Sequence, residues 1–182
     1  MDGPARVAIE RTHATVSFKT LTGIHRGLAK AADKERTMNL APAESSLTQV
    51  TLSPRLLSEL GDPHSTLRAT TQRSGPVVIV RAGGEIDASN EHIWQRLVGE
   101  AAAVASQPGP FVVDVNGLDF MGCCAFAVLA AESERCRRRG VELRLVSCDP
   151  GVARVIEAGN LRGVLSLHPT TDAALATTVA GR

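Results

Sequence analysis

The sequence predicts an α/β domain over residues 66–182, with a mixed, mostly parallel sheet of about five strands and about four helices, after a poorly ordered N-terminal segment. In this region, short β-branched runs alternate with segments whose apolar residues recur at helical spacing, an order typical of parallel strands joined by helical crossovers. Apolar residues make up 43% of the chain but aromatic residues only 3%, so the core must be built from small aliphatic side chains, which suits this class.

The first 65 residues form a separate segment, because they lack sustained periodicity and are interrupted repeatedly by glycine and proline. We expect residues 1–65 to be a flexible or loosely structured leader. Two short helices are predicted within it: one in which Leu21, Ile24, Leu28 and Ala31 recur at helical spacing, and one capped by Ser53 with Pro54 at its first position. Met38 opens a polar stretch and is a candidate native start, which would make residues 1–37 the product of an upstream start choice.

The first half of the domain is predicted to contain a hairpin, a helix and a strand. Alternating residues at 67–71, an RSG turn and the β-branched run at 77–83 predict the hairpin. Helical spacing follows over 89–104, with Ser89 as the expected cap. The apolar run at 111–115 comes directly after a PGP turn and predicts the next strand.

The second half continues the alternation. A helix is predicted at 123–139, because Gly140 beyond it suits a left-handed C-terminal cap. The run at 141–147 alternates apolar and polar residues as a strand does, and Asp149 with Pro150 forms the cap and first turn of another helix. The last two predicted elements are a strand at 164–167 and a helix at 172–179.

Composition and motifs exclude several classes of function. The net charge of +1 favours neither nucleic acid nor an anionic membrane as a direct partner, and the longest apolar run, 123–131, is too short to span a bilayer. The sequence has no apolar secretory segment. Two of its four cysteines are adjacent and none forms a CxxC pair, which favours reduced thiols over a disulfide framework, so we expect a cytoplasmic protein. It has no phosphate-binding loop, metal spacing or hydrolase motif, so we expect no cofactor, no metal and no catalytic site.

A pair of cysteines stands in the stretch GLDFMGCCAFAVL, where a strand gives way to a helix. Cys123 and Cys124 are therefore expected at the carboxyl end of a parallel strand, the side on which open α/β sheets place their functional sites. The N–H groups and dipole at a helix start favour an anion, which permits thiolate chemistry. The alternative is that the two small side chains only pack the helix against the sheet.

Four motifs follow one another in order between residues 66 and 180. They are VRAGGEIDASN, FVVDVNGLDFM, RRRGVELRLVS and VARVIEAGNLRGVLSLHPTTDAALA. This series resembles a STAS domain, specifically that of the bacterial anti-sigma factor antagonists. The resemblance implies a STAS-like fold and a non-enzymatic regulator that works by partner switching. The unphosphorylated antagonist binds an anti-sigma factor, often a serine kinase, and so releases a sigma factor for transcription.

The regulatory serine of that family lies in DSSGL or DSTGL at the start of the second helix. Aligning FMGCCAF with FMDSSGL puts Gly122 on the aspartate, Cys123 on the first serine, Cys124 on the phosphoacceptor and Ala125 on the glycine. A thiol thus replaces the acceptor hydroxyl, which excludes ordinary serine phosphorylation at this position. Redox control is the alternative, with Cys148 as bridging partner, because it ends the next strand and should emerge at the same edge.

The resemblance and the strand-end geometry together predict the partner-binding face. Its expected residues are Asp87, Ser89, Asn90, Asp119, Met121, Gly122, Cys123 and Cys124. Two other functions remain open: a thiol-based redox-reactive protein, and a STAS sensory or assembly module tethered by the leader. The sequence favours no particular oligomeric state.

Overall fold

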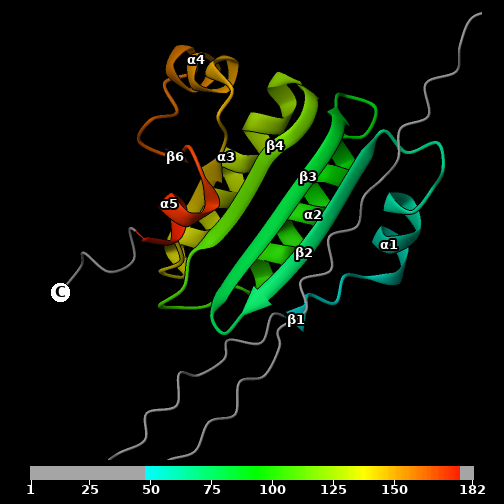
Figure 1. Ribbon diagram of the computed structural model, residues 1–182, viewed down its shortest axis with the longest axis horizontal. Coiled ribbons are helices and arrows are strands. Elements are labelled where there is room, and N and C mark those ends of the chain that lie inside the picture. Colours follow the sequence, from blue (N-terminus) through cyan, green and yellow to red (C-terminus); the bar gives the residue numbers. More distant parts are fainter. Residues whose placement is uncertain (1–47, 177–182) are drawn as a thin grey trace, which may run out of the picture. The chain divides into compact units, whose positions relative to one another are not determined.

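The computed structural model describes residues 48–176, which form one sheet and its covering helices (Figure 1). The strands are β1 (Thr48–Gln49), β2 (Leu67–Ser74), β3 (Val77–Ile86), β4 (Phe111–Met121), β5 (Leu143–Val146) and β6 (Ser166–His168). The helices are α1 (Pro54–Leu60), α2 (Glu91–Val104), α3 (Cys123–Arg138), α4 (Pro150–Ala158) and α5 (Thr171–Ala176). The predicted α/β class is confirmed. To the five strands and four helices expected of the domain, the region before residue 66 adds β1 and α1, and α1 is the short helix predicted after Ser53.

The six strands lie side by side in chain order, and their directions follow from their connections. β2 and β3 pair antiparallel, as strands joined by a tight turn do, and β1 pairs antiparallel with β2 after the connection through α1. β3, β4, β5 and β6 pair parallel, as strands must when a helix carries the chain back between them. The mixed, mostly parallel sheet predicted from the sequence is therefore confirmed.

Residues 48–65 belong to the folded domain, which differs from the expectation that everything before residue 66 is loosely attached. Val50, Leu52 and Leu56 are buried in the main core. The predicted Ser53 cap is confirmed, because its Oγ accepts from the N–H of Leu56, and it also donates to Glu100 of α2 at 2.6 Å. Sequence periodicity did not reveal the burial of this segment, because Val50 and Leu52 lie in the connection between β1 and α1 and only Leu56 lies in the short helix. Residues 1–47, with the candidate start at Met38 and the helix predicted over 21–31, lie outside the described residues.

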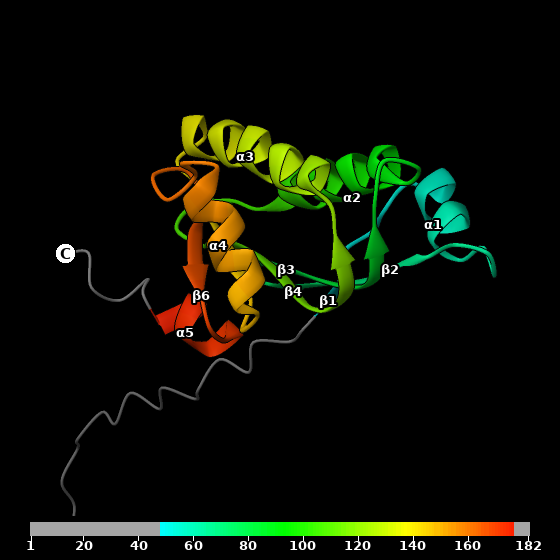
Figure 2. The same cartoon turned by 90° about the horizontal axis from the view of Figure 1, so that it is seen from above.

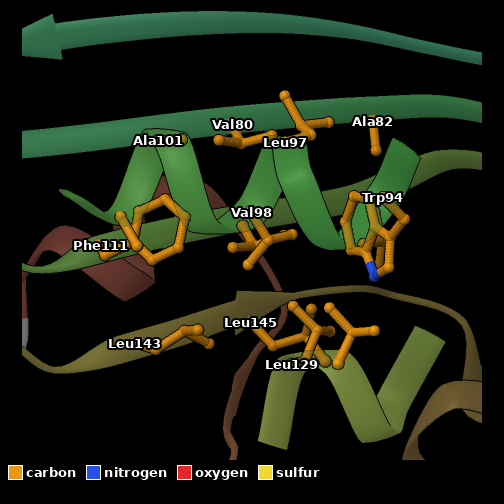
Figure 3. Close-up of a cluster of buried hydrophobic side chains, with 14 of the residues drawn as sticks. Val80, Ala82, Trp94, Leu97, Val98, Ala101, Phe111, Leu129, Leu143 and Leu145 are labelled. Carbon is orange, nitrogen blue, oxygen red and sulfur yellow. The ribbon is translucent and has the colours of Figure 1, made fainter. Parts of the chain in front are cut away.

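The helices cover the two faces of the sheet unequally. α2 and α3 lie on one face, and α5 lies on the other (Figure 2). The larger core fills the α2 and α3 side, where small aliphatic side chains of β3, β4 and β5 meet both helices (Figure 3). Trp94 is the largest fully buried side chain, and its Nε1 donates to the carbonyl oxygen of Ala125 at 3.2 Å. This hydrogen bond ties α2 to the first turn of α3. The second face has a smaller cluster under α5, made of Ile79, Val112, Val146 and Ala174.

Most predicted helix ends agree with the structure. Gly140 adopts φ of 69°, and the N–H of Val141 donates to the carbonyl of Cys136, which together close α3 in a Schellman arrangement. Asp149 caps α4 by accepting from the N–H of Gly151 at 2.8 Å. Ser89 is not the cap of α2, because Asn90 occupies that position.

Strand lengths were predicted less well. β4 runs on to Met121 instead of ending at residue 115, whereas β5 and β6 are shorter than the predicted runs at 141–147 and 164–167. The extra residues of β4 are a mixture of polar and apolar ones, NGLDFM, and they pair with β3 although they lack the continuous β-branched run of residues 111–115. Within residues 48–176, none of the helices combines the length and the apolar character that crossing a bilayer requires.

Replacing Leu56 tests whether the segment before residue 66 is integral to the fold. Leu56→Ala removes a fully buried side chain, and we expect the free energy of unfolding to fall by about 2–5 kcal/mol in chemical denaturation. Leu57→Ala is the matched control, since Leu57 is 51% exposed on the same helix and its loss should change stability by no more than about 0.5 kcal/mol. Equal, small effects of both changes would contradict the packing of α1.

Candidate partner-binding site

The parallel pairing of β3 with β4 brings together the two halves of the predicted binding face. The pairing extends to Ile86 and Met121, the last residues of the two strands. Directly beyond it, the N–H of Gly122 donates to the carbonyl oxygen of Ile86 at 2.8 Å. The turn at 87–90 and the segment 119–124 therefore emerge next to each other, at the carboxyl end of the sheet (Figure 1).

Asn90 braces the turn that follows β3. Only 6% of its surface is exposed. Its amide oxygen accepts from the N–H of Asp87 at 3.0 Å, and its Nδ2 donates to Thr66 Oγ1 at 2.9 Å and to the carbonyl of Glu85 at 2.8 Å. The side chain of Asn90 thus holds the site from within, and it presents little surface to a partner.

Asp87 and Ser89 form the outer part of this turn. One carboxylate oxygen of Asp87 accepts from both the N–H of Ser89 at 2.8 Å and its hydroxyl at 2.6 Å. These hydrogen bonds, chiefly the one from the hydroxyl, lower the pKa of Asp87 below its ordinary value. The turn therefore carries a negative charge. The Ser89 hydroxyl was predicted to cap α2, but the helix begins one residue later, with the carbonyl of Asn90 accepting from the N–H groups of Ile93 and Trp94.

The start of α3 has no side-chain cap. Gly122 is the N-cap residue and has an extended backbone conformation. A Cβ added at Gly122 would stand 3.2 Å from the carbonyl oxygen of Ile86 and 3.5 Å from the Sγ of Cys124. An aspartate, which the family motif has here, would thus need a shift of a few tenths of an ångström in its neighbours. This chain instead leaves the first N–H groups of α3 without a capping side chain.

The three cysteines of the predicted site differ in exposure and position. Cys123 is exposed, Cys124 is half-buried and Cys148 is exposed, and all three thiols are free. The pairing of β4 with β5 ends at Asp114 and Val146, and the N–H of Cys148 donates to the Oδ1 of Asn116 at 2.7 Å. Cys148 is therefore level with the middle of β4, whereas the other two cysteines follow its last residue.

A hollow of about 80 Å³ separates the end of β4 from the start of α4. Its lining includes Asp119, Met121 and Cys148, but neither Cys123 nor Cys124. The structure thus brings Cys148 beside the predicted binding face without joining it to the cysteine pair. The bridge from Cys148 to that pair stays a prediction.

Cys136 and the arginines at 137–139 make their contacts within the fold, outside the predicted binding face. Burial raises the pKa of the Cys136 thiol above its ordinary value. Arg137 and Arg138 pair with Glu134, as expected for cations in the last turn of a helix, and Arg139 donates to the carbonyl of Ala102. Among the described residues, no group of three or more His, Cys, Asp or Glu side chains is arranged to hold a metal ion.

The predicted binding face does not include Phe120, although both of its neighbours in the chain, Asp119 and Met121, belong to that face. The side chain of Phe120 is 54% exposed, although it belongs to β4. The sequence contained an indication of this exposure. Phe120 follows Asp119 near the end of a strand, and it belongs to no helical or alternating apolar pattern that would predict its burial. Its exposure became visible only with the sheet pairing in place.

Comparison with known proteins identifies the family. The STAS domain model matches residues 68–174. A Mycobacterium tuberculosis protein named "Putative anti-anti-sigma factor Rv2638" is 60% identical over 144 residues, which cover 79% of this chain and 97% of that protein. The "Anti-sigma-F factor antagonist RsfA" of the same organism is 60% identical over 114 residues, which cover 63% of this chain and 89% of RsfA.

A solved structure agrees with these relatives. The crystal structure of an anti-sigma factor antagonist from Mycobacterium paratuberculosis has a TM-score of 0.56 and 27% identity, covering 66% of this chain and 99% of that one. The chain therefore belongs to the STAS-domain family, among the bacterial anti-sigma factor antagonists, and the predicted family is confirmed.

Thiol reactivity should follow the exposure of the four cysteines. In the folded protein at mildly alkaline pH, we expect a thiol-exchange reagent to modify Cys123 and Cys148 quickly and Cys124 more slowly. Cys136 should react only after denaturation, because burial and a raised pKa leave little accessible thiolate. Peptide mapping of the modified sites checks the order, and Cys148→Ser should remove one fast-reacting group. Rapid labelling of Cys136 would contradict this arrangement.

Proposed function

We propose that this chain is an anti-sigma factor antagonist that binds an anti-sigma factor through the face formed after β3 and β4. The residues proposed to form this face are Asp87, Ser89, Asn90, Asp119, Met121, Gly122, Cys123 and Cys124, and buried Asn90 contributes by holding the turn that presents the others. The observation that carries the proposal is the pairing of β3 with β4, extended by the bond from Gly122 to Ile86, which joins both segments into one surface. The names of the relatives at 60% identity support the class of partner.

The proposed mechanism is partner switching without catalysis. An antagonist that occupies the anti-sigma factor in competition with the sigma factor frees the sigma factor by mass action. Because Asn90 already holds the turn at 87–90, little ordering is needed on binding, which favours affinity. The partner is proposed to be an anti-sigma factor of the serine-kinase type, and the site of action is then the cytoplasm.

The cysteine pair determines how such binding is controlled. In the family motif, a phosphate on the serine adds about −1.5 to −2 charges to the docking face and repels the partner. Cys124 takes that position here and its thiol is half-buried, so the wild-type chain is proposed to escape this form of shut-off. A charge placed at residue 124 should still weaken docking, because residue 124 lies within the proposed face.

Control through sulfur is the second candidate, favoured by the exposure of Cys123 and Cys148. Joining two thiols in a disulfide releases two protons and transfers two electrons to an oxidant such as a peroxide. Binding measured before and after mild oxidation tests it, with Cys148→Ser as the variant that cannot form this bridge. Oxidation that leaves wild-type binding unchanged would remove this candidate.

Substitutions at residue 124 provide the main test. Against the anti-sigma-F-type factor of the same genome, we expect the wild type and Cys124→Ser to bind with dissociation constants within about threefold of each other. Cys124→Glu should bind at least about tenfold more weakly, because it brings an unpaired charge into the contact. Isothermal titration calorimetry measures all three constants.

Kinase treatment separates the switch from the docking surface. With a kinase-type anti-sigma factor and ATP, Cys124→Ser should gain one phosphate by intact mass and lose affinity, while the wild type gains none at this position. Failure of the reduced wild-type protein to bind any anti-sigma factor of its genome would overturn the proposed function.

A further inference from the structure

Phe120 is the most exposed of the large apolar side chains among residues 48–176. The other aromatic side chains described, Trp94, Phe111 and Phe126, are all buried. This chain has four phenylalanines, one tryptophan and no tyrosine, so an aromatic ring left in solvent is an exception here. Exposed aromatic rings that no part of the fold covers are typical anchors of protein interfaces.

The position of Phe120 connects it to the proposed binding face. Its partner across the β3–β4 ladder is Glu85, and the next pair along the ladder is Ile86 with Met121. The turn at 87–90 and the start of α3 both begin directly beyond that pair. Phe120 also lines the hollow between β4 and α4. The ring therefore stands where the two segments of the face meet.

Acidic residues outnumber basic ones around this position, although Arg68, opposite Gly83 on the β2–β3 ladder, contributes one positive charge nearby. The segments that emerge at this end of the sheet, 61–66, 85–92, 116–124 and 148–150, contain no arginine or lysine. Their acidic residues are Asp62, Glu85, Asp87, Glu91, Asp119 and Asp149. One hollow is lined by both Asp62 and Ser89, and the hollow beside Phe120 by both Asp119 and Asp149, so the segments adjoin.

The ion pairs of the domain lie elsewhere. Seven pairs join arginines to glutamates within residues 48–176, and none includes one of these six carboxylates. Arg154, one turn into α4, donates to the carbonyl of Pro150 and not to a carboxylate. The surface around Phe120 is therefore negative, and charges across an interface are arranged to be complementary.

We propose that Phe120 is the apolar anchor of the interface, and that it inserts into an apolar pocket of the anti-sigma factor bordered by arginine or lysine side chains. This inference rests on the proposed function and names the chemistry of its partner surface. Burial of the ring supplies the affinity, since a few buried aromatic residues carry most of the binding energy in such interfaces. The carboxylates act mainly on the rate of association, because exposed charges steer the encounter.

Truncating the ring tests the anchor. With the same anti-sigma factor, we expect Phe120→Ala to raise the dissociation constant at least about 30-fold, the loss typical of a central interface residue. Leu57→Ala is the matched control, because Leu57 is nearly as exposed, at 51%, but lies on α1 outside the proposed face. It should leave the dissociation constant within about twofold. Thermal unfolding of both variants, expected near the wild-type midpoint, verifies that they are folded.

Neutralising two carboxylates tests the charged border. Glu85→Gln with Asp119→Asn should slow association about tenfold at low salt and leave the dissociation rate constant within about twofold, as measured by surface plasmon resonance. At high salt the difference in association should disappear, because screening removes the steering. Glu157→Gln, at an exposed position of α4 in an ion pair with Arg162, is the control and should not change association.

The outcomes separate this inference from the function on which it rests. If the wild type binds and folded Phe120→Ala binds equally well, the anchor is overturned and the proposed function stands. If the wild type binds but association is independent of salt and of both carboxylates, the cationic border is overturned. If the wild type binds no anti-sigma factor, the proposed function itself fails.

Discussion

The parallel pairing of β3 with β4 continues through two irregularities to the last residues of both strands, and the candidate site depends on it. The register shifts once between Arg81 and Gly83 and again between Gly84 and Glu85. A Cβ at Gly84 would stand 2.0 Å from the carbonyl oxygen of Thr66, and φ there is 87°, a conformation that favours glycine. The glycines of RAGGEID therefore serve strand pairing, in a sequence where they match no phosphate-binding motif.

The interactions around the site divide into those that hold it and those left for a partner. Asn90 uses its whole amide in hydrogen bonds to Asp87, Glu85 and Thr66. The bond from Trp94 to Ala125 fixes the first turn of α3 against α2. The side chains of Asp119, Phe120 and Cys123, in contrast, are exposed to solvent. A rigid backbone that presents free side chains is the arrangement that binding by a preformed surface requires.

Local patterns in the sequence predicted the elements whose signals are complete within a few residues. The hairpin, the Asp149 cap and the glycine-terminated end of α3 are of this kind, because turn and cap chemistry acts between near neighbours. Ser89 was misassigned because α2 begins one residue later, after Asn90, whose side chain holds the preceding turn. The packing of the segment before residue 66 into the domain was missed, although its helix was predicted, because its burial comes from α2 and the sheet, which no short window of sequence contains.

The sequence by itself determined the order of strands and helices, the family to which the chain belongs, and the presence of thiols where the family motif has hydroxyls. These follow from residue identity and short-range spacing. Only the tertiary structure decided that β4 reaches Met121, that Cys148 is level with Asn116, and that Phe120 is exposed. Register, relative position and burial arise from contacts between residues distant in the chain, and they depend on all the strands and helices packing at once.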